Sequence, residues 1–288
     1  MSTSWVIVTW NSAATLGALL DSIQAQDGAP HEVIVVDNAS HDDTVALARR
    51  HPIGARVIAN DTNRGLAAGN NQGLQAAEGR HLVICNPDVV LHDGCAKALV
   101  ACAERHPRSG FVVARLHLPD GSLQPGVGDL PTLKETLLGR KAAQRRGSES
   151  GIWWDGWSHD QERAVGHGQE ACYLVRREAY RDVGPQDERY RLDWEGLDWS
   201  ERVHRAGWEI WFCPDAIATH VGGHSIRQAQ LRWIVSSHRG MYRYFADRRS
   251  TWARPLLALA FGLRAGLKTC VFLVRRDAYH VPRSAPQP

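Results

Sequence analysis

The chain has 288 residues, 43% of them hydrophobic, which is enough for one large domain or a domain with an appendage. Its 23% charged residues and 11 Trp argue against an intrinsically disordered chain. The net charge is only +3, so no nucleic-acid partner is expected. Residues 226–288 carry 12 Lys and Arg against two Asp, a net charge of +10, which leaves −7 for residues 1–225. A mildly acidic body therefore precedes a strongly basic tail.

Short apolar runs alternate with helical patterns along the first 90 residues. Such alternation predicts right-handed βαβ units and a mostly parallel sheet. The predicted strands cover 6–9, 33–36, 56–59 and 81–85, and the predicted helices 12–26, 42–50 and 67–77. Further along the chain we expect strands at 111–118, 168–175 and 210–212 and a helix at 199–206. The fold class is therefore α/β.

Residues 119–168 and the basic tail depart from this alternation. The first stretch is rich in Gly and Pro and then polar, which predicts a functional lid or disorder. In the tail, 256–274 is apolar but contains Arg264 and Lys268, each costing roughly 2.5–3.5 kcal/mol at a bilayer centre. We expect an amphipathic helix lying in a membrane surface, with a helical hairpin packed on the domain or in a dimer as the alternative. The predicted domains are 1–225 and 226–288.

The six cysteines form no CxxC pair, and the N-terminus has no signal-peptide pattern. We therefore expect free thiols in a reducing cytoplasm.

Polar residues follow three of the predicted strands, where ligands bind in parallel sheets. They are Thr9 and Asn11, Asp37 and Asn38, and Asn86 and Asp88. Asp88 could hold Mg²⁺ or Mn²⁺ against a diphosphate, because hard cations prefer oxygen ligands. The alternative is a plain Asx-Pro turn at the end of a strand.

Three further motifs have both a functional and a structural interpretation. In Asn63–Gly73, Arg64 and Asn70 could contact phosphate or sugar, or the glycines could pack a helix on the sheet. Glu195 and Asp198 have the i, i+3 spacing that places two acids in one cleft, where one could act as a general base, or they cap a helix. His220 could bind a metal or a phosphate, or lie on the surface.

Taken in order, these segments resemble family 2 glycosyltransferases of the bacterial rhamnosyltransferase-like branch. The resemblance covers about residues 5–225. It rests on seven stretches: Val6–Asn11, Val35–Ser40, Asn63–Gly73, Asn86–Asp88, Ala171–Tyr180, Asp187–Trp208 and His220–Ser225.

The resemblance implies an inverting enzyme with a GT-A fold that uses Mg²⁺ or Mn²⁺. It assigns Asp88 and His220 to the metal and Glu195 or Asp198 to catalysis. Relatives often carry their presumed base where this chain has Gly196, so we favour Glu195, with Asp198 second. The implied donor-binding residues are Thr9, Asn11, Asp37, Asn38, Arg64, Asn70 and Asn86.

The implied donor is deoxythymidine diphosphate rhamnose or a uridine diphosphate sugar, and the implied acceptor is a glycan or a polyprenyl-linked saccharide. Membrane contact through residues 248–276 would make the protein peripheral on the cytoplasmic face of the cell membrane. Because Gly196 removes an acid, a catalytically impaired nucleotide-sugar-binding protein of the same fold is the alternative.

Overall fold

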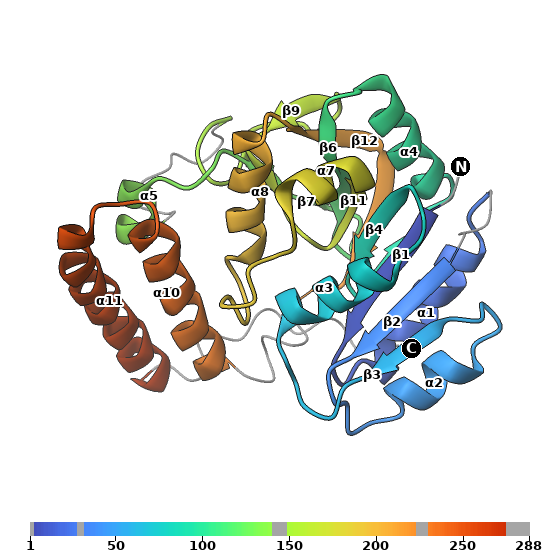
Figure 1. Ribbon diagram of the computed structural model, residues 1–288, viewed down its shortest axis with the longest axis horizontal. Helices are drawn as coiled ribbons and strands as arrows, with labels where there is room; N and C mark the ends of the chain where they lie inside the picture. Colours follow the sequence, from blue (N-terminus) through green and yellow to red (C-terminus); the bar gives the residue numbers. More distant parts are fainter. Residues whose placement is uncertain (1–2, 28–31, 140–148, 223–229, 275–288) are drawn as a thin grey trace.

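A ten-stranded sheet forms the centre of the computed structural model, which describes residues 3–27, 32–139, 149–222 and 230–274 (Figure 1). Its strand order is β3-β2-β1-β4-β11-β6-β12-β5, with β7 paired to β6 and β9 to β12. The strands are β1 (Thr3–Thr9), β2 (Glu32–Asp37), β3 (Arg56–Ala59), β4 (His81–Cys85), β5 (Val89–Leu91), β6 (Ser109–His117), β7 (Leu123–Gln124), β9 (Arg163–Val165), β11 (Cys172–Arg176) and β12 (Glu209–His220). β8 (Val127–Gly128) and β10 (His167–Gly168) form a separate pair.

The predicted mostly parallel sheet is confirmed. β1 pairs in parallel with β2 and β4, and β6 pairs in parallel with β12. β11 is antiparallel to both β4 and β6 and so joins these two parallel groups. In the β1–β2 register Thr9 lies beside Asp37, so the polar residues that follow both strands meet at one edge.

Alternating side chains of the central strands bury both faces of the sheet. Trp5 and Ile7 belong to a core shared with α1 and α4, whereas Val6 and Val8 belong to a core shared with α3 and α8. The helices on the domain are α1 (Ala13–Gln24), α2 (Thr44–Arg50), α3 (Leu66–Ala76), α4 (Cys95–Arg105), α5 (Leu133–Leu138), α7 (Arg177–Val183) and α8 (Glu195–Arg205). The amphipathic helix α4 was not among the sequence-based expectations.

Residues 119–168 contain more structure than their composition predicts. The described part contributes β7, β8, α5 and β9, while 140–148 lie outside the described residues. Thr132 and Glu135 form a capping box at the start of α5. Trp154 and Trp157 are buried in the α3–α8 core. Burial of these two large aromatic side chains fixes the described residues around them against the core.

The basic tail forms α10 (Gln230–Ala246), the short helix η1 (Thr251–Ala253) and α11 (Arg254–Val274). α10 and α11 lie side by side at one end of the molecule (Figure 1). Tyr190 and Trp194 pack into the core of this pair, so the tail rests on the segment that leads into α8. The packed hairpin that we considered as an alternative is therefore present; Arg275 and Arg276 lie outside the described residues.

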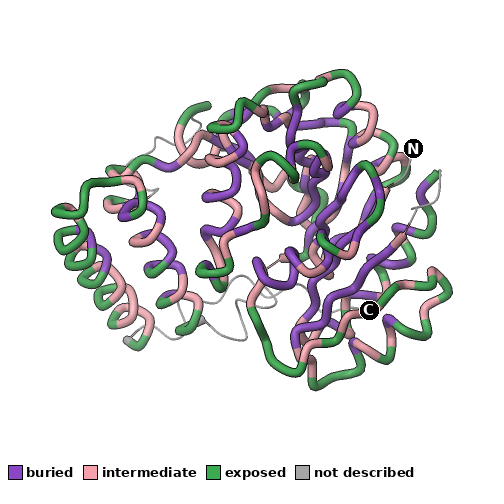
Figure 2. Tube along the Cα trace, viewed as in Figure 1, coloured by how far each residue is buried: buried purple, intermediate pink, exposed green. Residues whose placement is uncertain are grey.

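Two of the three cationic residues of α11, Arg264 and Lys268, face inward. Arg264 donates to the carbonyl of Leu137 at 3.2 Å and contacts His238 at 2.9 Å. Burial lowers the pKa of Lys268 below its usual value. On the outer side Leu259, Leu263 and Leu267 are each more than 60% exposed, and Figure 2 shows this exposed side along the helix. By length and composition alone, Thr251–Leu273 is long and apolar enough to cross a membrane, with a mean hydropathy of 1.7.

Candidate active site

A cavity of about 1210 Å³ opens at the carboxyl ends of β1, β2 and β4 and extends to α10. One wall carries Thr9, Asn38, Asn86 and Asp88 from the strand ends, together with His220 from the end of β12. Another part of the wall is basic, because segment 189–192 and α10 contribute five arginines: Arg189, Arg191, Arg232, Arg239 and Arg243. The cavity therefore joins a polar edge of the sheet to a cationic wall built by segment 189–192 and the tail.

Thr9 and Asp37 are joined at the strand edge. The Thr9 hydroxyl donates to Oδ1 of Asp37 at 2.8 Å, and the amide and hydroxyl of Ser40 donate to the same carboxylate at 2.8 and 2.5 Å. Asp37 is 1% exposed, and a buried carboxylate with three donors is fully used in holding its loop. Thr9 lines the cavity, and Asp37 lies behind it.

Asn11 links the loops that follow β1 and β2. Its backbone amide donates to the Ser40 hydroxyl at 2.8 Å, and its side-chain oxygen accepts from the backbone amide of His41 at 2.9 Å. The left-handed backbone of Asn11, with φ of 51°, allows both contacts. Asn11 is not among the cavity-lining residues of the described chain.

Asn38 and Gly65 close the cavity on the side of α3. The Asn38 amide donates to the carbonyl of Gly65 at 3.1 Å. Gly65 has φ of +94°, and a Cβ there would lie 2.8 Å from the carbonyl oxygen of Arg191. Only glycine avoids both the strain and the clash. This close approach brings the Asn63–Gly65 loop against the segment 189–192.

The structural interpretation of the remaining glycines in this motif is confirmed. A Cβ on Gly69 would lie 2.7 Å from Val8, and one on Gly73 would lie 2.3 Å from Val6. α3 therefore needs small residues to pack on β1. Asn70 is buried and donates to Gln186 at 3.0 Å, and Arg64 is exposed and lies 3.5 Å from Glu188. Neither lines the cavity in the described chain, so their contacts with a donor stay a prediction.

Asp88 and His220 lie together on the cavity wall. Nε2 of His220 is 3.4 Å from Oδ1 of Asp88, and Nδ1 is 3.1 Å from Oε1 of Gln124. Because an amide oxygen only accepts, the proton on Nδ1 points at Gln124. Two acceptors, Nε2 and the carboxylate, then face each other and require a positive species between them, either a proton or a cation.

The donor set of Asp88 and His220 fits a divalent cation. A carboxylate with an imidazole nitrogen suits such ions, and Gln124 orients the imidazole as an outer partner does in metal sites. Burial raises the pKa of Asp88, but the hydrogen bond and charge of His220 hold that pKa below its usual value. A carboxylate and a neutral imidazole are the forms of these two side chains that a divalent cation binds.

The two acidic candidates of α8 are separated rather than gathered in one cleft. Asp198 is held by Arg248 at 2.7 Å and by Arg202 at 2.9 Å. Glu195 is 3% exposed, and its Oε2 has no hydrogen-bond partner in the described part of the chain. Burial, and then the charges of Glu170 and Asp193, raise the pKa of Glu195 well above its usual value. Neither carboxylate is among the lining residues of the described cavity.

Several residues of this region were not found by sequence reasoning. Gln124 and Gln169 line the cavity and are hydrogen-bonded to each other at 3.1 Å. Glu170 follows Gln169 and lies against Gly196. No local pattern marks isolated Gln or Glu residues in an irregular stretch. The contact between Glu170 and Gly196 can be recognised only in the folded structure, where their two segments lie together.

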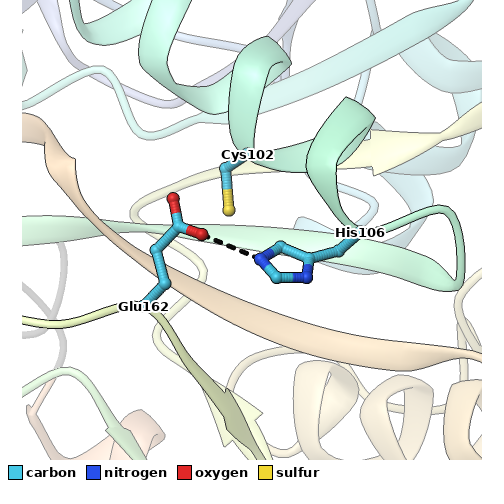
Figure 3. A group of neighbouring side chains, drawn as sticks. All are labelled: Cys102, His106 and Glu162. Carbon is cyan, nitrogen blue, oxygen red and sulfur yellow. Dashed lines mark hydrogen bonds and ion pairs between the residues drawn. The ribbon is translucent and has the colours of Figure 1, made fainter.

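Figure 3 shows a second group of side chains with metal-binding atoms, namely Cys102, His106 and Glu162, which lie within 4.8 Å of one another. Nε2 of His106 is 2.8 Å from Glu162, whose other carboxylate oxygen is paired with Arg105. The His106 ring also stacks on Trp211 at 3.5 Å. Because these contacts already use the Glu162 oxygens and none of the three residues lines the cavity, we interpret the group as an anchor between α4 and the segment before β9.

A family model described as glycosyl transferase family 2 matches residues 4–184. The chain is 30% identical over 289 residues to an N-acetylglucosaminyl-diphospho-decaprenol L-rhamnosyltransferase of Mycobacterium tuberculosis (strain ATCC 25618 / H37Rv). That alignment covers 95% of this chain and 92% of the relative. The similarity therefore extends over nearly the whole of both proteins.

Solved structures share the fold. A mannosyltransferase from Pyrobaculum calidifontis in complex with GDP-Man and Mn²⁺ has a TM-score of 0.57 and 19% identity, covering 98% of this chain and 76% of that one. S. aureus TarS 1-349 in complex with UDP-GlcNAc has a TM-score of 0.56 and 17% identity, covering 99% and 77%. At these identities the likeness concerns the fold, which is of the GT-A type as predicted.

Proposed function

Because the chain belongs to glycosyltransferase family 2, we propose that it transfers a sugar, with inversion, from a nucleotide-diphosphate donor to a hydroxyl of a membrane-associated acceptor. The observation that carries this proposal is the cavity itself. The Asp88–His220 pair at the edge of the sheet and the arginines of α10 line the same cavity. Such an arrangement suits a reaction between two phosphate-bearing molecules.

On the donor side, Thr9, Asn38 and Asn86 would contact the nucleotide, while Asp37 and Asn11 would hold the loops that present it. Asp88 and His220 would hold Mg²⁺ or Mn²⁺. When bound, such a cation supplies charge stabilisation for a diphosphate leaving group. We propose deoxythymidine diphosphate rhamnose as the donor, with a uridine diphosphate sugar as the second candidate. Support for rhamnose comes from the rhamnosyltransferase that aligns along the whole chain.

On the acceptor side, a polyprenyl-linked saccharide matches both the cationic wall and the tail. Arginines bind phosphate oxygens well, and α10, which carries three of those lining the cavity, packs against α11. The outer leucines of α11 could rest in the acyl boundary of a membrane while Arg264 and Lys268 face the protein. This orientation would make the protein peripheral on the cytoplasmic face and would hold the cavity near a lipid-linked substrate.

The acceptor hydroxyl must lose a proton during transfer. Of the two acids considered from the sequence, Asp198 has both carboxylate oxygens engaged by guanidinium groups, Oδ2 by Arg202 and Oδ1 by Arg248. Glu195 lies in a buried group of carboxylates and has a raised pKa. We therefore place the base among the carboxylates around Glu195 rather than at Asp198.

A donor panel with purified protein tests the proposal. Thermal shift with and without Mn²⁺ should reveal one nucleotide sugar that stabilises the protein in a metal-dependent way. The same donor should then be consumed when a polyprenyl diphosphate-linked N-acetylglucosamine is added. Binding without turnover for any acceptor would instead support the impaired nucleotide-sugar-binding alternative, and no binding at all would refute the proposed site.

A further inference from the structure

Glu170 fills the space that Gly196 leaves in the first turn of α8. A Cβ built on Gly196 would lie 2.3 Å from Cδ and 2.4 Å from Oε1 of Glu170. These distances are shorter than any ordinary contact, so the two positions cannot both carry a side chain in this arrangement. The carboxyl group of Glu170 thus lies where the side chain of residue 196 would begin.

Other side chains hold Glu170 in this place. The hydroxyl of Tyr173 donates to its Oε1 at 3.2 Å, and Nε2 of Gln186 donates to the same oxygen at 2.9 Å. Gln186 is itself fixed, because its side chain accepts from Asn70 and its backbone amide donates to Asn71. The buried amides of α3 therefore serve to orient Glu170 at a distance, as positioning residues.

Glu170 lies beside the cavity, although it is not among the lining residues of the described chain. Its neighbour Gln169 lines the cavity, and the carbonyl of its other neighbour, Ala171, accepts from the amide of the lining residue Asn86 at 2.8 Å. Glu170 is partly exposed, whereas Glu195 is buried. Of this adjacent pair of glutamates, Glu170 is the less buried and the one next in the chain to a lining residue.

We propose that Glu170 is the general base of the sugar transfer, standing in space for the side chain that Gly196 lacks. The inference rests on the proposed function and names the residue that serves it. The acceptor O–H bond breaks and its proton passes to a carboxylate oxygen of Glu170. The acceptor oxygen forms the new bond to the anomeric carbon, and the bond from that carbon to the donor diphosphate breaks, its electron pair leaving with the diphosphate oxygen.

The surroundings of Glu170 suit this role. Burial raises the pKa of Glu170 to about 7, against hydrogen bonds from Tyr173 and Gln186 that lower it, and the charge of Asp193 raises it further. Burial, and then the charge of Glu170, also raises the pKa of Glu195, so the two adjacent carboxyl groups resist being ionised at the same time. A base with a pKa near the working pH is effective in proton transfer. The titratable groups that face Glu170 are Tyr173, Asp193 and Glu195.

The first test compares Glu170→Gln, Glu195→Gln and the wild type in steady-state transfer. Glu170→Gln should lower kcat about 10²–10⁴-fold while donor affinity in thermal shift stays unchanged. The wild-type kcat should rise with pH through about 7, since the base must be deprotonated. That limb of the profile should vanish in Glu170→Gln. Glu104→Gln, on the outer end of α4, is the matched control and should leave the profile unaltered.

The second test moves the carboxylate back to residue 196. Glu170→Gly should lose activity. The double variant Glu170→Gly/Gly196→Asp should have a kcat at least about tenfold higher than that of Glu170→Gly, because the new side chain enters the vacated space. The proposal is overturned if Glu170→Gln keeps wild-type kcat, or if the limb near pH 7 disappears only in Glu195→Gln. Absence of transfer by the wild type with every acceptor would instead refute the proposed function, and this inference with it.

Discussion

Replacing Gly196 by Ala should damage catalysis far more than stability. The added methyl would lie 2.3 Å from Cδ of Glu170, and relaxed carbon contacts need about 3.5 Å, so the carboxylate must move by about 1 Å. The atoms that must move belong to the end of a flexible side chain, so the fold can absorb the change. A displacement of about 1 Å in a positioned group can cost about 10²-fold in rate.

The expected stability change for Gly196→Ala is small because two effects oppose each other. Ala in place of Gly within a helix contributes roughly 1 kcal/mol. Disturbing the hydrogen bonds of Glu170 to Tyr173 and Gln186 costs about 0.5–1.5 kcal/mol each. The free energy of unfolding should therefore fall by no more than about 2 kcal/mol.

Urea denaturation and initial-rate assays on the same preparations would separate the two quantities. Gly17→Ala is the matched control. Gly17 lies in the middle of α1, and a Cβ there would contact only Leu47, at 3.8 Å. That variant should keep wild-type kcat. If Gly196→Ala were fully active, or if its loss of rate simply followed a loss of folded protein, the argument that the Glu170 carboxylate acts in transfer would be refuted.

Three further predictions concern the metal pair, the junction with the tail and the membrane. A donor at 100-fold its Kd should stabilise the wild type by about 2.7 kcal/mol in total. Asp88→Asn should abolish the part of this stabilisation that depends on Mn²⁺, measured by thermal shift with and without the ion; retention of that part would exclude Asp88 as a ligand. Arg248→Ala should lower the free energy of unfolding by about 1.5–3 kcal/mol in urea, because Asp198 and Glu201 each lose one of their two guanidinium partners, whereas the exposed Arg249→Ala should change it by under about 0.5 kcal/mol. Leu263→Ser/Leu267→Ser should weaken sedimentation with anionic vesicles at least about tenfold and leave stability unchanged, since both leucines are more than 60% exposed; equal binding by this variant and by the α5 control Leu138→Ser would show that the outer face of α11 does not contact lipid.

The part of the fold that could be predicted is the part specified by local sequence patterns. Apolar runs and amphipathic spacing depend only on near neighbours, so β1 to β4 and the helices between them were found to within a few residues. The same alternation predicts that the residues after these strands gather at one edge, and Thr9, Asn38, Asn86 and Asp88 do line one cavity. The strands within 119–168 were missed, since that stretch has weak periodicity and the described part of it depends on burial of Trp154 and Trp157, whereas α4 was overlooked although its amphipathic spacing is regular.

The sequence by itself determined the strand-and-helix order, the family and the polar strand ends, because each follows from residues close together in the chain. Only the tertiary structure shows which acids are paired and which lie beside Gly196. The i, i+3 spacing of Glu195 and Asp198 does not reveal Arg248, which follows α10 in the chain and forms an ion pair with Asp198. From the sequence, Gly196 indicates only that an acid is missing. The fold places Glu170, just before β11, against Gly196, and a contact between distant segments produces no periodic or compositional pattern in either segment.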